Sequence, residues 1–181
     1  MPNLRQIALI VGSLRQDAYS KKIAAFLRAN APANWQITEI EINDLPLYNQ
    51  DYDDDPIESY ERVRGQLSVV DAVLFISPEH NRSIPAALKN VIDIASRPAG
   101  KSVWTGKKTA VITSSPGTFG GLSAGLHLRQ VLQLLSAQVL VAPEVYLSRI
   151  TDSLDEQGNL SDERTQTFLR RFIQTFDDWL A

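Results

Sequence analysis

Three short polar loops each follow an apolar run and precede a helical pattern, and they hold the side chains best suited to chemistry. The apolar runs are Ile7 to Val11, Val69 to Ile76 and Ala110 to Thr113, and the loops begin at Gly12, Pro78 and Ser114. In an open parallel α/β sheet, ligands bind beyond the carboxyl ends of the strands, where loop amides and helix N-termini converge. We therefore expect the three loops to form one ligand site.

The first loop suits a phosphate monoester. It places Ser13, Arg15 and Ser20 around a helix start, with Ala18 and Tyr19 beside Ser20. Hydroxyl and backbone N–H groups can donate hydrogen bonds, the guanidinium neutralises charge, and the helix dipole adds about 0.3 to 1 kcal/mol. The alternative is that Ser13 caps a turn and Arg15 is a surface residue. The loop lacks the Walker lysine and the three-glycine fingerprint, so neither a nucleoside triphosphate nor a dinucleotide is favoured.

The second and third loops show no acid–base or nucleophile set. Glu79 and His80 are adjacent, but no third group is placed to orient them. These loops suit the walls of a site, because their backbone amides can satisfy the edge atoms of a planar heteroaromatic ring, and Gly117 lets such a ring approach. Ordinary turn chemistry would also explain Gly117, Gly120 and Gly121. We predict no catalytic side chain.

The composition fits one globular unit. The chain has 181 residues, 44% of them hydrophobic, which is enough for one core, so we expect a single domain over residues 1–181. A net charge of −3 with scattered Lys and Arg argues against a nucleic-acid surface. The absence of cysteine excludes thiolate metal sites and iron–sulfur clusters, and we expect no metal. Without a signal peptide or an apolar run of membrane-spanning length, we expect a soluble, cytoplasmic protein with no membrane partner.

Strand and helix patterns alternate along the chain. Strands are predicted at 7–11, 36–42, 69–76, 108–113 and 138–141, and helices at 20–30, 57–67, from Pro85, at 122–135 and at 161–180. Leu126 is expected to face inward from the fourth helix. The alternation predicts right-handed crossovers and a parallel sheet of five strands covered on both faces. We therefore expect an α/β, flavodoxin-like three-layer sandwich with strand order 2-1-3-4-5, which places the first two loops side by side.

The loop motifs together resemble the NADPH-dependent FMN reductase family, with bacterial quinone and chromate reductases as the nearest members. The resemblance covers roughly residues 5 to 145, and its motifs are Gly12-Ser13-Leu14-Arg15, the segment 78–90, and Ser114-Ser115 with Gly120-Gly121. It implies that FMN is bound non-covalently, with its phosphate in the loop from Ser13 to Ser20. The ring would lie against Pro78, Glu79, His80, Asn81 and Arg82, with Ser115 and Gly117 along the other edge.

The resemblance also implies an activity and an assembly. NAD(P)H would reduce the flavin, and a quinone or similar small electrophile would then take the electrons from it. The helix start after Gly120-Gly121, if it points at the ring, would favour anionic reduced flavin. The segment Leu45 to Asp51 resembles a family segment that lies near the partner subunit's flavin, so a homodimer, possibly a tetramer, is expected.

Three departures from the family pattern bear on these expectations. The family usually has Ser-x-Asn where this chain has Ala18-Tyr19-Ser20, so one phosphate hydroxyl is missing and FMN affinity is expected to be weaker. His80 replaces the family's tyrosine and is expected to act mainly through its backbone. An arginine that some members use in tetramers corresponds to Leu122 or Ser123, which disfavours assembly beyond a dimer.

Two other functions remain open at this point. One is a flavodoxin-type electron carrier, which the acidic cluster from Asp51 to Asp55 supports, although a solvated loop also explains that cluster. The other is an FMN-binding regulatory module. Two further side chains also have two interpretations: Trp104 could pack internally or line an entrance, and His127 is interpreted as a satisfied or surface residue rather than a ligand.

Overall fold

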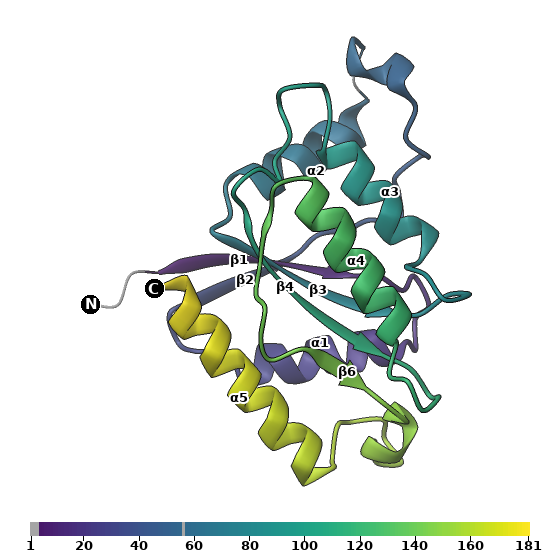
Figure 1. The fold of residues 1–181 in the computed structure, drawn as a ribbon, viewed down its shortest axis with the longest axis vertical. Helices are drawn as coiled ribbons and strands as arrows, with labels where there is room; N and C mark the ends of the chain where they lie inside the picture. The colour runs from purple at the N-terminus through teal and green to yellow at the C-terminus, as the bar shows by residue number, and fades with distance from the viewer. Residues whose placement is uncertain (1–3, 56) are drawn as a thin grey trace.

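The computed structural model describes residues 4–55 and 57–181 of the chain. Its strands form one parallel sheet in the order β2-β1-β3-β4-β5, with β6 also paired to β4 (Figure 1). The strands are β1 (Arg5–Val11), β2 (Trp35–Glu39), β3 (Ala72–Pro78), β4 (Lys108–Ser114), β5 (Gln138–Val139) and β6 (Val145–Leu147). The flavodoxin-like order predicted from the alternation of elements is confirmed.

The last strand of the sheet is divided. Gln138 pairs with Lys108 near the start of β4, while Val145 and Leu147 pair with Ile112 and Ser114 at its end. Between the two pieces lies Pro143, which has no N–H to donate to a ladder and belongs at an edge or an interruption of a strand. The single strand predicted at 138–141 was therefore only the first half, and β6 was missed.

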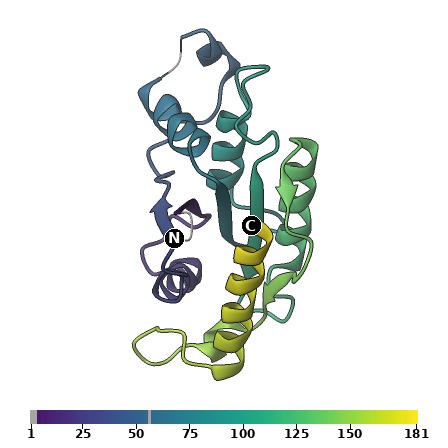
Figure 2. The same cartoon turned by 90° about the vertical axis from the view of Figure 1, so that its left-hand side faces the viewer.

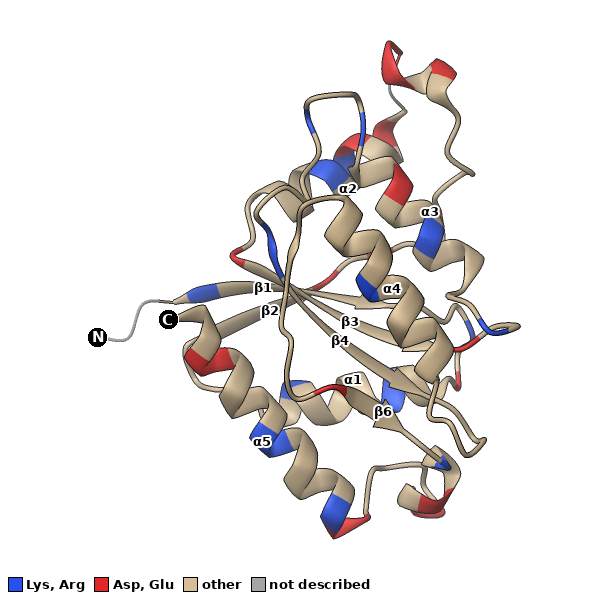
Figure 3. Cartoon of the chain, viewed as in Figure 1, with Lys and Arg blue, Asp and Glu red and all other residues tan. Residues whose placement is uncertain are grey.

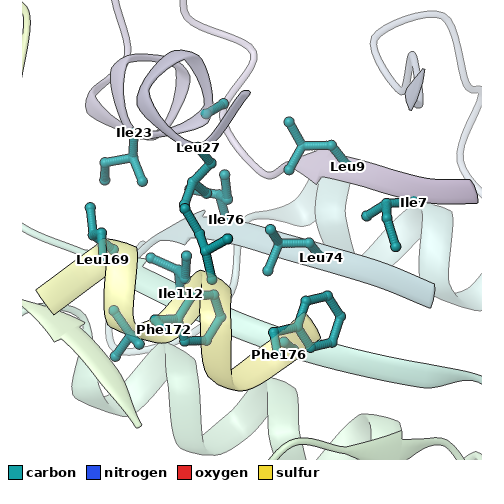
Figure 4. Packing of buried hydrophobic residues seen from close by; sticks show 14 of the residues in the cluster. Ile7, Leu9, Ile23, Leu27, Leu74, Ile76, Ile112, Leu169, Phe172 and Phe176 are labelled. Carbon is teal, nitrogen blue, oxygen red and sulfur yellow. The ribbon is translucent and has the colours of Figure 1, made fainter. Parts of the chain in front are cut away.

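Two helices cover one face of the sheet. These are α1 (Tyr19–Ala29) and α5 (Glu163–Leu180), and their apolar residues meet those of the central strands (Figure 4). The start of α5 is fixed by Asp162, whose carboxylate accepts a hydrogen bond from Thr165 N at 2.8 Å. Phe172 and Phe176 recur one helical turn apart and are almost fully buried, so α5 is held by its apolar stripe.

The opposite face is covered by α2 (Glu58–Ser68), α3 (Ala86–Ala95) and α4 (Leu122–Leu134), and Figure 2 shows the sheet between the two helical layers. Trp104 is fully buried here, and its indole N–H donates to Ile92 O at 2.9 Å, so it packs internally and lines no entrance. Leu126 is 51% exposed, contrary to the inward position expected. Gly125 faces inward instead, close to Tyr146 and Thr113.

Two predicted strand boundaries shift. β3 begins at Ala72 rather than Val69, because α2 runs on to Ser68 and leaves Val69 75% exposed. β2 ends at Glu39, yet Ile40 and Ile42 remain buried because they join the core beneath α2 and α3. Among the described residues, we find no helix both long and apolar enough to cross a membrane.

Candidate functional site

The three polar loops follow neighbouring strands at one end of the sheet, at the right of Figure 1. They are the first loop (residues 12–18, after β1), the second loop (79–85, after β3) and the third loop (115–121, after β4). Gly12 N donates to Ile76 O at 2.8 Å, which continues the pairing of β1 with β3 into the first loop. A Cβ at Gly12 would lie 3.1 Å from Ser77 Oγ and 3.2 Å from Leu88 Cδ2. The close approach of Gly12 to β3 and α3 therefore favours glycine here.

The first loop leads into α1 without a side-chain cap. Ala18 is the N-cap residue and can accept no hydrogen bond through its methyl group, and the first turn holds no acidic residue. Ser20, in that turn, is 1% exposed, and its Oγ has no hydrogen-bond partner among the described residues. A buried hydroxyl left unpaired costs about 1–3 kcal/mol. An anion at this helix start would accept hydrogen bonds both from the uncapped N–H groups of α1 and from the Ser20 hydroxyl.

The first loop carries one basic and one acidic residue, Arg15 and Asp17. Ser13 is buried and its Oγ accepts from Arg15 N at 3.4 Å, while Arg15 itself is exposed, as the turn-capping alternative expects. Asp17 is the nearby acidic residue, and its ion pair with Lys22, at 2.9 Å, lowers the pKa of its carboxyl group. Because Lys22 offsets the charge of Asp17, Arg15 remains available to an incoming anion.

The second loop is built around a tight turn, the 80–83 turn. His80 N donates to Ser83 O and Ser83 N donates to His80 O, both at 2.9 Å. Asn81 and Arg82 both have positive φ, 50° and 65°, as the two central residues of a type I′ turn do. His80, Asn81 and Arg82 are all exposed at the tip. Since the paired bonds use only the groups of His80 and Ser83, the amides of the two central residues remain for a ligand.

Glu79, the residue before this turn, contacts both α4 and the turn. Its Oε2 accepts a hydrogen bond from Ala124 N at 3.2 Å, in the first turn of that helix. The same carboxylate lies 3.6 Å from the guanidinium of Arg82. A carboxylate therefore already partly neutralises the positive end of α4, which weakens the effect that this helix start would have on a flavin beside it.

The third loop is held against the chain that follows β6. Ser115 N donates to Leu147 O at 3.1 Å, and Arg149 N donates to Gly117 O at 3.0 Å. Gly120 has φ of 61°, and a Cβ there would lie 2.7 Å from the backbone carbon of Tyr146. The glycine is thus required by the fold itself. Ser115 Oγ accepts from Gly117 N at 2.9 Å, which leaves both residues on the rim of the site.

Two side-chain contacts join the second loop to the third loop and α4. Ser83 Oγ lies 2.8 Å from Nδ1 of His127, and the Arg82 guanidinium stacks on the Phe119 ring at 5.4 Å. His127 is thus satisfied by a protein partner, as interpreted from the sequence. The second and third loops are thus connected to each other, and the first loop follows β1, the strand next to β3.

The chain matches the family model described as NADPH-dependent FMN reductase over residues 5–152. It belongs to that family. Similar proteins include a quinone reductase from Pseudomonas putida, 42% identical over 99% of this chain and 97% of the relative, and a 2-hydroxy-1,4-benzoquinone reductase from Burkholderia sp., 39% identical over 97% and 96%. The family resemblance predicted from the loop motifs is confirmed.

Solved structures agree with this membership. FerB from Paracoccus denitrificans, described as a flavoenzyme NAD(P)H:(acceptor) oxidoreductase, superposes with a TM-score of 0.91 at 38% identity and covers 97% of each chain. A flavodoxin from Pseudomonas aeruginosa superposes with a TM-score of 0.59 at 14% identity, which supports the fold alone. The chain is thus an enzyme of the FMN reductase family on a flavodoxin-like fold.

The residues predicted from the sequence as site residues lie in or next to the loops at the carboxyl ends of β1, β3 and β4, at one end of the sheet. From the sequence, Ser114 was placed in a family motif but not among the binding residues; it is 2% exposed at the end of β4, and its Oγ has no partner among the described residues. A polar residue at the last position of a buried strand was the available signal. The contacts of Asn90 were also missed: its Oδ1 accepts from Tyr48 N at 2.7 Å and its Nδ2 donates to Pro46 O at 2.9 Å.

Proposed function

We propose that the chain transfers reducing equivalents from NAD(P)H to quinones or similar small electrophiles, using FMN held non-covalently between the three loops. The observation that carries the proposal is the start of α1, where an uncapped helix and the buried, unpaired Ser20 hydroxyl need an anion. The family match and the relatives named as quinone reductases support the same activity. When bound, FMN supplies the hydride-accepting and hydride-donating chemistry.

Each loop has a separate task in this proposal. Ser13, Arg15 and Ser20 hold the phosphate, with the backbone N–H groups of Ala18 and Tyr19 at the helix start. Pro78, His80, Asn81 and Arg82 line one side of the ring through their backbone, and Ser115 and Gly117 line the other edge. Glu79 belongs to the same wall but contacts α4. We assign no side chain as an acid, base or nucleophile.

The proposed enzyme is a homodimer, because the segment 45–51 presents an anchored apolar tip, and it acts in the cytoplasm, where NAD(P)H is available as co-substrate. Leu47 is 76% exposed, while its neighbours are anchored: Tyr60 Oη donates to Leu47 O at 2.8 Å, and Asn90 holds Tyr48 and Pro46. An apolar residue held rigidly in solvent suits burial against a second copy. Sedimentation of the purified protein tests this assembly.

The electron-carrier alternative depended on the acidic cluster. In the structure these acidic residues gather on and after η1 (Gln50–Asp53), at the top of Figure 3, whereas the three loops lie at the right. An acidic face that guides a partner protein should surround the site that exchanges electrons. The position of the cluster gives the carrier function no support.

Two measurements on the purified full chain test the proposed function. The visible spectrum, recorded before and after addition of FMN, should show a bound flavin with the protein in stoichiometric amount. Addition of NADPH and then of a simple benzoquinone should give sustained NADPH consumption without any partner protein. Colourless protein that takes up no FMN would contradict the proposal, as would flavin-loaded protein that oxidises NADPH only when a protein acceptor is added.

A further inference from the structure

The second loop is fastened to α4 on both sides of its turn. Before the turn, Glu79 Oε2 accepts from Ala124 N at 3.2 Å. After it, Ser83 Oγ lies 2.8 Å from Nδ1 of His127. Ala124 and His127 are three residues apart and so lie on the same side of the helix. The turn is therefore clamped to one helical face by two side chains that flank it.

The clamp holds a conformation that the turn's own residues disfavour. Asn81 and Arg82 are consecutive non-glycine residues with φ of 50° and 65°; asparagine tolerates this conformation, but it costs roughly 1 kcal/mol or more at Arg82. Two backbone hydrogen bonds between His80 and Ser83 offset part of this cost. The remainder has to come from contacts outside the turn.

Glu79 is the best placed source of such contacts. Its side chain is only 14% exposed, and its two carboxylate oxygens have different partners: Oε2 accepts from Ala124 N, and Oε1 lies 3.6 Å from Arg82 Nη1. The helix that it caps begins after Gly121, has no side-chain cap of its own and carries no acid in its first turn. Glu79 thus supplies, from 45 residues away, the cap that α4 lacks.

We infer that Glu79 is a positioning residue, which fastens the 80–83 turn to the first turn of α4 and so fixes the direction of the Asn81 and Arg82 amides. The part of the inference that concerns the flavin rests on the proposed function, because those amides are the groups that would meet the ring. The fastening itself is a property of the protein without FMN. The two can therefore be tested separately.

The first test is hydrogen exchange on the full chain without FMN. In Glu79→Ala, the amides of His80 and Ser83 should exchange about 10-fold faster, because a lost helix cap and ion pair are worth about that factor in local opening. Glu79→Gln keeps an oxygen that can accept from Ala124 N, and it should restore protection to within about 3-fold of the wild type. In both Glu79 variants, exchange of the β3 amides should stay unchanged. In the control variant Glu156→Ala, at an exposed glutamate, exchange of the turn amides should also stay unchanged.

The second test uses FMN titration and the reduction potential of the bound flavin. Glu79→Ala should weaken FMN binding about 10-fold, and Glu79→Gln should weaken it about 3-fold or less. Both variants remove a negative charge beside the wall of the ring, so both should raise the potential, an effect that a purely structural role would not produce. Failure of the wild type to bind FMN would overturn the proposed function and leave the exchange test standing.

Three results would overturn the inference itself. One is unchanged exchange of the turn amides in Glu79→Ala. Another is faster exchange of the turn and of β3 together, which would show general destabilisation rather than a local fastening. The last is a Glu79→Gln variant as perturbed as Glu79→Ala, which would show that hydrogen bonding to Ala124 N is not what holds the turn.

Discussion

The first loop and the second loop follow neighbouring strands at the same end of the sheet, but they are stabilised in different ways. The first leaves polar groups unsatisfied: α1 lacks a side-chain cap and the Ser20 hydroxyl is buried without a partner among the described residues. The second satisfies itself, through the paired bonds of its turn and the contacts of Glu79 and Ser83 with α4. The difference indicates that a ligand completes the first loop, whereas the second is set in advance by the protein.

The largest expected effect is on stability and concerns the third loop, which contacts the second loop. Gly120→Ala should lower the free energy of unfolding by about 3 kcal/mol, since φ is 61° and the new Cβ would lie 2.7 Å from backbone. The matched control is Gly117→Ala, where the nearest atom to the new Cβ is the movable Ser115 Oγ at 3.2 Å. Its change should stay below about 1 kcal/mol in urea denaturation. Equal effects at the two glycines would show that the third loop is not held where described.

The next effect concerns the first loop, where a substitution should change the affinity for FMN and leave the stability of the free protein unchanged. Arg15→Ala should weaken FMN binding by about 10- to 100-fold, the range expected for loss of a charge-assisted contact to phosphate. Because Arg15 is exposed and its side chain makes one weak hydrogen bond within the described part of the chain, at 3.5 Å to Asp17 O, the unfolding midpoint without FMN should not change. Fluorescence titration of FMN measures the first quantity and urea denaturation the second. Arg164→Ala, at an exposed residue of α5, is the control.

A smaller effect is expected for Ser20→Ala, which should stabilise the protein without FMN but weaken its binding of FMN. Ser20→Ala removes a buried hydroxyl that has no partner, so without FMN the free energy of unfolding should rise by up to about 1 kcal/mol. The same change should weaken FMN binding about 5-fold, because one donor to the phosphate is lost. If Ser20→Ala destabilised the free protein, the hydroxyl would have a partner and the first loop would be complete without a ligand.

The smallest effect is expected from loss of the contact between Ser83 and His127, which also fastens the 80–83 turn to α4. Ser83→Ala removes the contact with His127 but leaves the backbone bonds and the Glu79 cap in place. The turn amides should exchange about 2- to 3-fold faster, and FMN affinity should change by less than about 3-fold. Exchange measured by NMR resolves this difference. A larger effect than that of Glu79→Ala would reverse the order of importance of the two links.

The elements and the position of the site could be predicted from the sequence because they depend on local patterns. Apolar runs closed by Gly12, Pro78 and Ser114 mark buried strands, and alternation with helices leaves few topologies for a chain of this size. Each of these signals lies within a dozen residues.

What could not be predicted depends on contacts between distant segments. β6 forms because residues 145–147 reach the end of β4; their residues favour a strand, but three residues are too short a pattern to predict one. Leu126 and Gly125 exchange their expected positions because the ring of Tyr146 occupies the space that a side chain at 125 would need. The role of Glu79 at α4 depends on two loops meeting in space. From the sequence, its charge and its position next to His80 predicted only that Glu79 lines the ligand site.

The most direct measurement of the central claim compares FMN with riboflavin on the wild type and on Arg15→Ala. If the phosphate sits at the start of α1, the wild type should bind FMN at least about 100-fold more tightly than riboflavin, since several charge-assisted hydrogen bonds depend on the phosphate. In Arg15→Ala, this ratio should fall about 10-fold or more while the affinity for riboflavin stays the same. Equal binding of the two ligands by the wild type, or an unchanged ratio in the variant, would contradict the account.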